Sequence, residues 1–145
     1  MGDWLKNGWL VEHQTSAQEI ADLMAAVERD LADCRAPGLS ADWRLSIAYS
    51  AALRSATAAL AAEGYRASRD QYHFRVINSL AFTIEAEEKL IALLDRFRKK
   101  RNIGLYDRAG VASEQEAQTM MELAQRLRDE VEAWLGKKHP ELLET

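Results

Sequence analysis

Residues 40–64 read SADWRLSIAYSAALRSATAALAAEG, and this stretch decides the fold. Ser40 can cap the first turn of a helix and Gly64 can end one, so we expect a helix over about residues 41–63. One face of this helix carries Leu45, Ala48, Tyr49, Ala52, Ala56 and Leu60. Small side chains at four-residue spacing let neighbouring helices approach closely. The stretch therefore predicts the central helix of a bundle.

Two other segments carry the pattern of a helix start. Ser16 is followed by Glu19, and Ser113 is followed by Glu116. A serine with a glutamate three residues later is the capping-box pattern. Long helices are expected at residues 16–35, 41–63, 85–106 and 113–135, with a shorter one at 70–82. Short connections between long helices make neighbours run in opposite directions, so the predicted fold class is all-α, an antiparallel up-and-down bundle of four to five helices.

The two ends of the chain are expected to be less regular than the bundle. Residues 1–15 contain Trp4 and Trp9 and predict a short N-terminal helix. The last helix is expected to stop at Gly136, which leaves residues 137–145 as a flexible charged tail. No sheet is predicted, because β-branched residues are sparse and nowhere alternate with polar ones over the length of a strand.

Composition restricts the class of protein. A length of 145 residues fits one domain, residues 1–145, and 48% hydrophobic with 29% charged residues is typical of a globular chain. The single cysteine, Cys34, has no intramolecular partner for a disulfide, and we expect it to be a small apolar residue on a helix. There is no signal-peptide pattern and no apolar run near the roughly 18 residues of a membrane span. We expect a soluble, cytoplasmic protein that does not contact a membrane.

Positive charge is concentrated in one segment. Residues 96–107 read RFRKKRNIGLYD, which places five basic residues within six positions of a chain whose net charge is −4. A local basic patch on an acidic protein attracts a phosphate-bearing partner at one place without making the whole surface adhesive. We therefore expect the function to depend on this segment.

Helical geometry separates the side chains of the basic segment. Arg101 and Asn102 fall where the apolar stripe ending at Phe97 would continue, whereas Lys99 and Lys100 point more nearly outward. An arginine on an apolar stripe needs either a buried acidic partner or a cleft that admits solvent and ligand. Two interpretations stay open: a solvated basic face with Arg101 paired to a carboxylate, or an organised groove.

The sequence contains no motif for metal or nucleophilic catalysis. It has no Cys/His cluster, no His-Glu-x-x-His pattern, no glycine-rich phosphate loop and no Gly-x-Ser-x-Gly elbow, so neither a metal site nor a cofactor is expected. His73 lies between Tyr72 and Phe74. It fits a hydrogen-bonded packing residue, and it is also a candidate ligand-binding residue.

The order of these segments resembles the HEPN superfamily of helical-bundle domains, found in prokaryotic toxin–antitoxin systems and in defence and RNA-processing proteins. Residues 48–53 (AYSAAL) and 58–66 (AALAAEGYR) resemble the central helix of one bacterial branch and its end. Residues 72–80 (YHFRVINSL) resemble the third helix of that branch, and residues 98–106 resemble its signature. The resemblance covers about residues 17–135, and it implies a homodimeric helical domain.

Active members of this superfamily are metal-independent ribonucleases, whose motif is an Arg, a polar residue and, a few positions later, a His. Arg101 and Asn102 match the first part, but Tyr106 stands where the His is expected. A tyrosine with a pKa near 10 is mostly protonated at pH 7 and is a poor base, although it can donate a hydrogen bond to phosphate. The resemblance therefore implies binding more than cleavage.

Three hypotheses follow from the residues and the resemblance. The favoured one is a homodimeric module that binds RNA, a nucleotide or a partner protein through Arg98, Arg101, Asn102 and Tyr106, with His73 close by. The alternative is a ribonuclease toxin whose candidate catalytic residues are Arg101, Asn102 and Tyr106, or Arg101 with His73, and whose partner is a nucleotidyltransferase-type antitoxin. The third is a structural bundle without a ligand.

Overall fold

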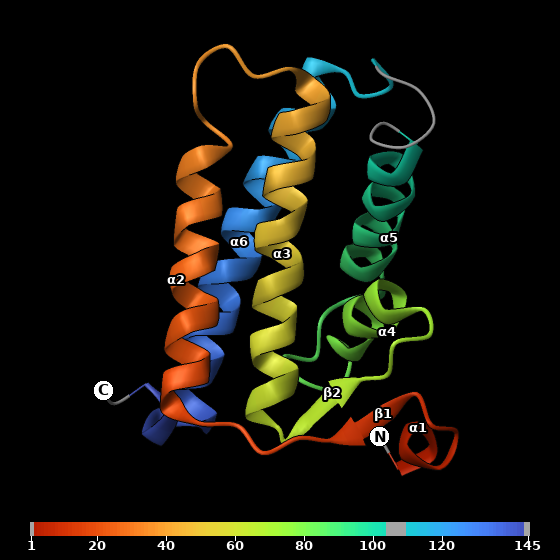
Figure 1. Ribbon diagram of the computed structural model, residues 1–145, viewed down its shortest axis with the longest axis vertical. Coiled ribbons are helices and arrows are strands. Elements are labelled where there is room, and N and C mark those ends of the chain that lie inside the picture. The colour runs from red at the N-terminus through yellow and green to blue at the C-terminus, as the bar shows by residue number, and fades with distance from the viewer. Residues whose placement is uncertain (1, 104–109, 144–145) are drawn as a thin grey trace.

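The computed structural model describes residues 2–103 and 110–143, and helix α3 (Ala41–Ala62) lies at its centre. Helices α2 (Ala17–Asp33) and α6 (Glu114–Lys138) pack against one side of α3. Helices α4 (Tyr72–Ser79) and α5 (Glu88–Asn102) cover another side. The chain runs upward in α2 and α5 and downward in α3 and α6 (Figure 1). The predicted all-α class is confirmed.

Most of the buried side chains of α3 are alanine. Ser40 caps the helix as predicted, because its side-chain oxygen accepts a hydrogen bond from the backbone N–H of Trp43. The buried alanines of this helix are Ala48, Ala51, Ala52, Ala56, Ala58, Ala59, Ala61 and Ala62. Because these side chains are small, helices can approach α3 on several sides at once. The central position predicted for this segment is therefore what the structure shows.

A short antiparallel ladder, which the sequence analysis did not predict, joins the N-terminal segment to the end of α3. Strand β1 (Leu10–Glu12) pairs with strand β2 (Tyr65–Ala67), and Leu10 lies opposite Ala67. Both of these residues are buried, so each strand contributes one apolar side chain to the core. The helix expected within residues 1–15 is shorter, since α1 is Gly2–Lys6.

The two N-terminal tryptophans pack against α4. The guanidinium of Arg75 lies 3.8 Å from the centroid of the Trp9 ring, a cation–π contact. The rings of Trp4 and Trp9 meet edge to face at 5.7 Å, and the Trp4 ring meets Phe82 at 4.9 Å. These contacts hold the first residues of the chain on the outside of α4.

The C-terminal segment is more regular than predicted. Helix α6 continues through Gly136 to Lys138, and residues 140–142 form a 3-10 helix whose Leu142 packs against the core. Gly136 does not end the helix because the backbone N–H of His139 still donates to the carbonyl of Leu135 at 2.8 Å. The flexible tail expected over residues 137–145 is therefore structured up to its last described residue, Leu143.

The dependence of the fold on small residues in α3 can be tested at Ala59, which is fully buried. We expect Ala59→Leu to lower the free energy of unfolding by about 1–3 kcal/mol, because the added methyl groups force the neighbouring helices apart. Ala25→Leu adds the same atoms at an exposed position of α2 and serves as the control. Urea unfolding measures both, and equal stability of the two variants would contradict the role given to α3.

Candidate functional site

A pocket of about 700 Å³ opens between the last two turns of α5 and the first turn of α4. It is lined by Gln71, Tyr72, His73, Phe74, Arg98, Arg101 and Asn102. Two segments that are well separated in the sequence thus form one site. The residues predicted from the basic segment, Arg98, Arg101 and Asn102, meet His73 here.

The shape of the chain before α4 brings four consecutive residues to the pocket. Gln71 adopts a left-handed backbone conformation with φ of +53°, which is uncommon for a residue other than glycine. Helix α4 starts directly after this turn, and the backbone N–H of Arg75 donates to the Gln71 carbonyl at 2.9 Å. The first helical turn therefore presents residues 71–74 to the pocket.

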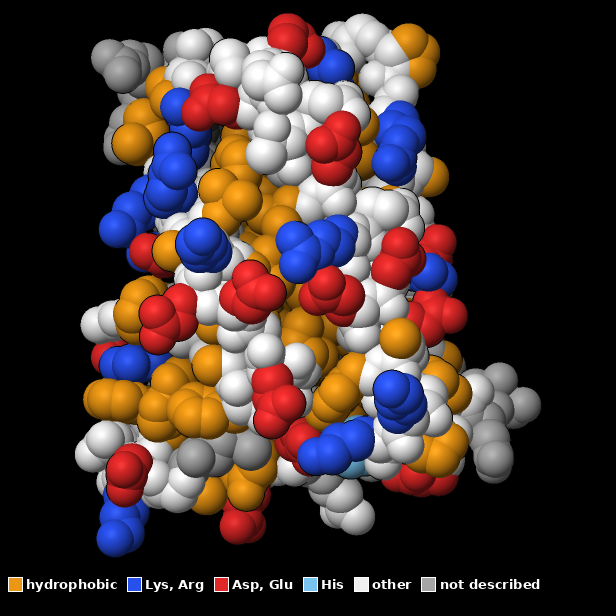
Figure 2. All heavy atoms as spheres, turned by 180° about the vertical axis from the view of Figure 1, so that it is seen from behind, with side chains coloured by type: hydrophobic (Ala, Val, Ile, Leu, Met, Phe, Trp, Pro, Cys, Tyr) orange, Lys and Arg blue, Asp and Glu red, His pale blue; other side chains and the backbone are white. Residues whose placement is uncertain are grey.

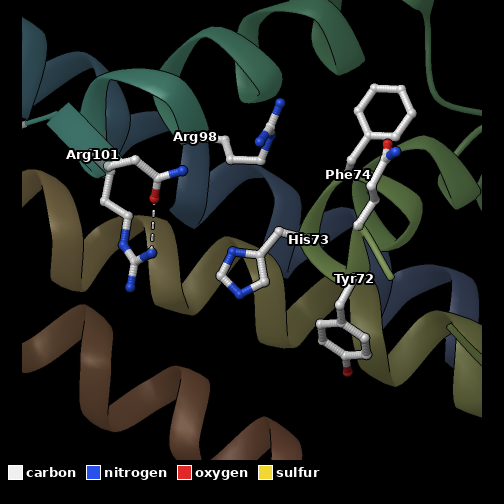
Figure 3. A pocket seen from close by; sticks show the side chains of 7 residues that line it. Tyr72, His73, Phe74, Arg98 and Arg101 are labelled. Atoms are coloured by element: carbon white, nitrogen blue, oxygen red, sulfur yellow. Dashed lines mark hydrogen bonds between the residues drawn. The ribbon is translucent and has the colours of Figure 1, made fainter. Parts of the chain in front are cut away.

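Aromatic rings lie beside both pocket arginines. The Arg98 guanidinium lies 5.8 Å from the centroid of the Phe74 ring, and its Nε donates to Asp95 at 2.8 Å. The Arg101 guanidinium lies 5.6 Å from the centroid of the Tyr49 ring. Its Nη1 donates to the side-chain oxygen of Asn102 at 3.2 Å, the dashed line in Figure 3.

His73 connects the pocket to the core. Its Nδ1 lies 3.3 Å from the hydroxyl of Tyr49, a residue of α3 that is only 1% exposed. Burial raises the pKa of the Tyr49 hydroxyl above its ordinary value, so this group stays protonated. Burial also lowers the pKa of His73, and the positive charges of Arg101 and Arg98 lower it further. The imidazole is therefore neutral at neutral pH.

The lysines of the basic segment do not line this pocket. Lys99 is exposed and pairs with Asp95 at 3.4 Å. Lys100, which was expected to point outward, is half-buried and pairs with Glu116 at the start of α6. The expectation for Lys100 was wrong because α6 brings a carboxylate within reach. On the face seen in Figure 2, several positive side chains gather at the upper left, and over the rest of the face positive and negative side chains are interspersed.

One predicted site residue is not described. Tyr106 lies outside the residues that the structure describes, so its role stays a prediction. Conversely, the sequence analysis placed Tyr49 on the apolar stripe of the central helix and did not assign it to the site. Gln71, Tyr72 and Phe74, which line the pocket, were not assigned to the site either. For Tyr49, the hydroxyl itself was the available signal, because a buried tyrosine hydroxyl usually requires a hydrogen-bond partner.

The described part of the chain contains neither a group of metal-ligating side chains nor a bilayer-spanning helix. In residues 2–103 and 110–143, no three His, Cys, Asp or Glu side chains are grouped so that they could hold a metal ion. The helices in these ranges also include none with the length and apolar character that a bilayer span requires.

Cys34 is buried at the end of α2, where its thiol donates to the Leu31 carbonyl at 3.3 Å.

Comparison with known proteins adds no relative, since the chain matches no family model, no curated protein and no solved structure. The resemblance to the HEPN superfamily accordingly rests on the sequence segments alone.

The electrostatic coupling in the pocket can be measured at His73. We expect Arg101→Ala to raise the pKa of His73, because it removes a positive charge that disfavours the imidazolium. The midpoint of an NMR titration of the imidazole reports this pKa. Arg96→Ala is the matched control, since Arg96 is exposed on the same helix and does not line this pocket. An unchanged or lower midpoint in Arg101→Ala would show that Arg101 does not act on His73.

Proposed function

We propose that this protein is a HEPN-like homodimeric module that binds RNA or a nucleotide in the pocket between α4 and α5, without efficient catalysis. One observation carries the proposal. Arg98, Arg101 and Asn102 converge with two aromatic side chains on a single pocket, in a chain whose net charge is −4. Two positive charges and two aromatic rings therefore meet in one pocket.

Each kind of side chain in the pocket suits a part of a nucleotide. The planar forks of Arg98 and Arg101 can bind phosphate oxygens in two places at once. The rings of Tyr72 and Phe74 offer surfaces on which a base can stack. The adjacent amides can donate to and accept from the edge of a base. A ligand with both phosphate and base uses all of these groups.

The proton-transfer groups of the pocket favour binding over cleavage. His73 is neutral and could accept a proton, but metal-independent RNA cleavage also uses a group that donates one. Tyr49 is unsuited to that role, because its raised pKa makes the hydroxyl a weak acid. Among the described residues that line the pocket, His73 is the one imidazole, the side chain that most often transfers protons in enzymes. A single protomer thus offers one of the two groups that acid–base cleavage uses.

The alternative function is a metal-independent ribonuclease toxin with a nucleotidyltransferase-type antitoxin as partner. The position of His73 beside Arg98 and Arg101 favours it, because an imidazole is available although Tyr106 replaces the motif His. RNA cleavage by the wild type that is lost in both His73→Ala and Arg101→Ala would establish this alternative. Growth inhibition on expression, relieved by Arg101→Ala, would do so in cells.

The homodimer is proposed to form through α5, which would bring two pockets together. Ile103 directly follows this helix and is 39% exposed. We expect light scattering at tens of micromolar to give twice the chain mass of 16.4 kDa. Ile103→Glu should shift the mass toward the monomer. Leu143→Glu should not, although Leu143 is similarly exposed, because it follows α6 and lies away from α5 in the sequence. A monomer mass for the wild type would rule out the dimer.

Binding should depend on Arg101 far more than on another arginine of the same helix. We expect Arg101→Ala to weaken binding of fluorescent single-stranded RNA by about tenfold or more, because two charge-assisted contacts are lost. Arg96→Ala removes the same charge from the exposed side of α5 and should cost about threefold at most. Anisotropy titrations at several salt concentrations measure both effects, and affinity should fall as salt rises. Equal losses would indicate a diffuse charged surface and no organised site.

A further inference from the structure

We propose that the pocket binds a terminal phosphomonoester of a nucleotide, either free or at an RNA end, and that His73 takes up a proton when this group binds. The inference rests on the proposed function and narrows its ligand. A phosphodiester inside an RNA chain carries one negative charge. A phosphomonoester carries about 1.5 to 2 negative charges at pH 7, so it can use a further cation.

The surroundings of His73 make its charge conditional on a ligand. Among the described residues, the titratable or charged groups that face it include Tyr49 from α3, Tyr72 from α4, and Arg98 and Arg101 from α5. The described residues that line the pocket include no carboxylate. Without a bound anion, a protonated imidazole would be partly buried beside two guanidinium groups, and both conditions disfavour its charged form.

The positive charges on α5 do not fully neutralise a bound dianionic phosphate, so a protonated His73 can act as a third cation. Asp95 pairs with both Arg98 and Lys99, so part of the positive charge at this end of α5 is already offset. A dianionic phosphate between the two pocket arginines would still attract a further positive group. In the view of Figure 3, the imidazole of His73 projects between the side chains of Arg98 and Arg101 and that of Tyr72. It is placed to supply that charge, and the proton comes from solvent.

The shape of the pocket favours a single nucleotide unit over a long strand. Its volume of about 700 Å³ lies in the range typical of small-molecule sites. The ring of Phe74 lies beside Arg98, so a base stacked on this ring would place its own phosphate within reach of the guanidinium. The phosphate sites and the stacking surface are therefore close enough to serve one and the same nucleotide.

Calorimetry with two related ligands tests the inference directly. Adenosine 5′-monophosphate and its phosphate methyl ester share base and sugar but differ by one negative charge. At pH 7.5 the monoester is already mostly dianionic, so any proton taken up on binding is gained by the protein. This uptake is measured by comparing binding enthalpies in buffers of different ionisation enthalpy. The wild type should bind the monoester about tenfold more tightly or better and should take up a fraction of one proton.

Two variants assign the proton to His73. In His73→Asn and His73→Gln the preference for the monoester should fall to about twofold and proton uptake should vanish. The wild-type affinity for the monoester should also fall as pH rises from 7 to 9, because the imidazole of the complex loses its proton. Proton uptake that persists in both variants would overturn the role of His73.

The remaining outcomes separate this inference from the proposed function. Equal wild-type affinity for the monoester and its methyl ester would overturn the inference. A second outcome would overturn the inference but leave the proposed function intact. In that outcome, RNA binding needs Arg101 but is equally tight for 5′-phosphorylated and 5′-hydroxyl RNA, and the free monoester is not preferred. Binding of phosphoserine as tightly as the nucleotide would overturn the nucleotide assignment. Failure of every nucleotide and RNA to bind would overturn both proposals.

Discussion

The close approach of neighbouring helices to the alanine surface of α3 is the constraint on which the rest of the structure depends. Positions such as Ala52 and Ala59 are fully or almost fully buried and add little side-chain bulk between helices. Tyr49 is the largest of the fully buried side chains, and its hydroxyl reaches His73 in the pocket. The helix that sets the spacing of the bundle therefore also contacts His73, a residue that lines the pocket.

Local signals in the sequence predicted the helices well. Ser16, Ser40 and Ser113 cap α2, α3 and α6 as expected, because a capping hydrogen bond spans only three residues. The β1–β2 ladder could not be predicted in this way, since each strand has three residues and its partner lies far away in the chain. Gly136 was misread as a stop because a glycine ends a helix only where the backbone turns left-handed, and Gly136 is not among the described glycines with positive φ.

The candidate site shows the same division between local and long-range information. Helical periodicity within the basic segment was enough to set Arg101 apart from Lys99, because both lie on one helix. It could not foresee the pairing of Lys100 with Glu116, which depends on where α6 packs. Nor could it show that the turn at Gln71 carries His73 to the same pocket, since this requires the packing of α4 against α5.

The β1–β2 ladder has a consequence for the order in which the chain can fold during synthesis. Strand β1 leaves the ribosome long before its partner, and the tryptophans beside it pack against side chains of α4 and the residues that follow. Until those residues emerge, Trp4 and Trp9 lack their native neighbours, whereas α2 and α3 can already pair. Contacts between distant parts of a chain form late, because the loop between them must first be closed. The segment that contains Trp4, Trp9 and β1 is thus made before its packing partners, and it reaches its native position only after they have emerged.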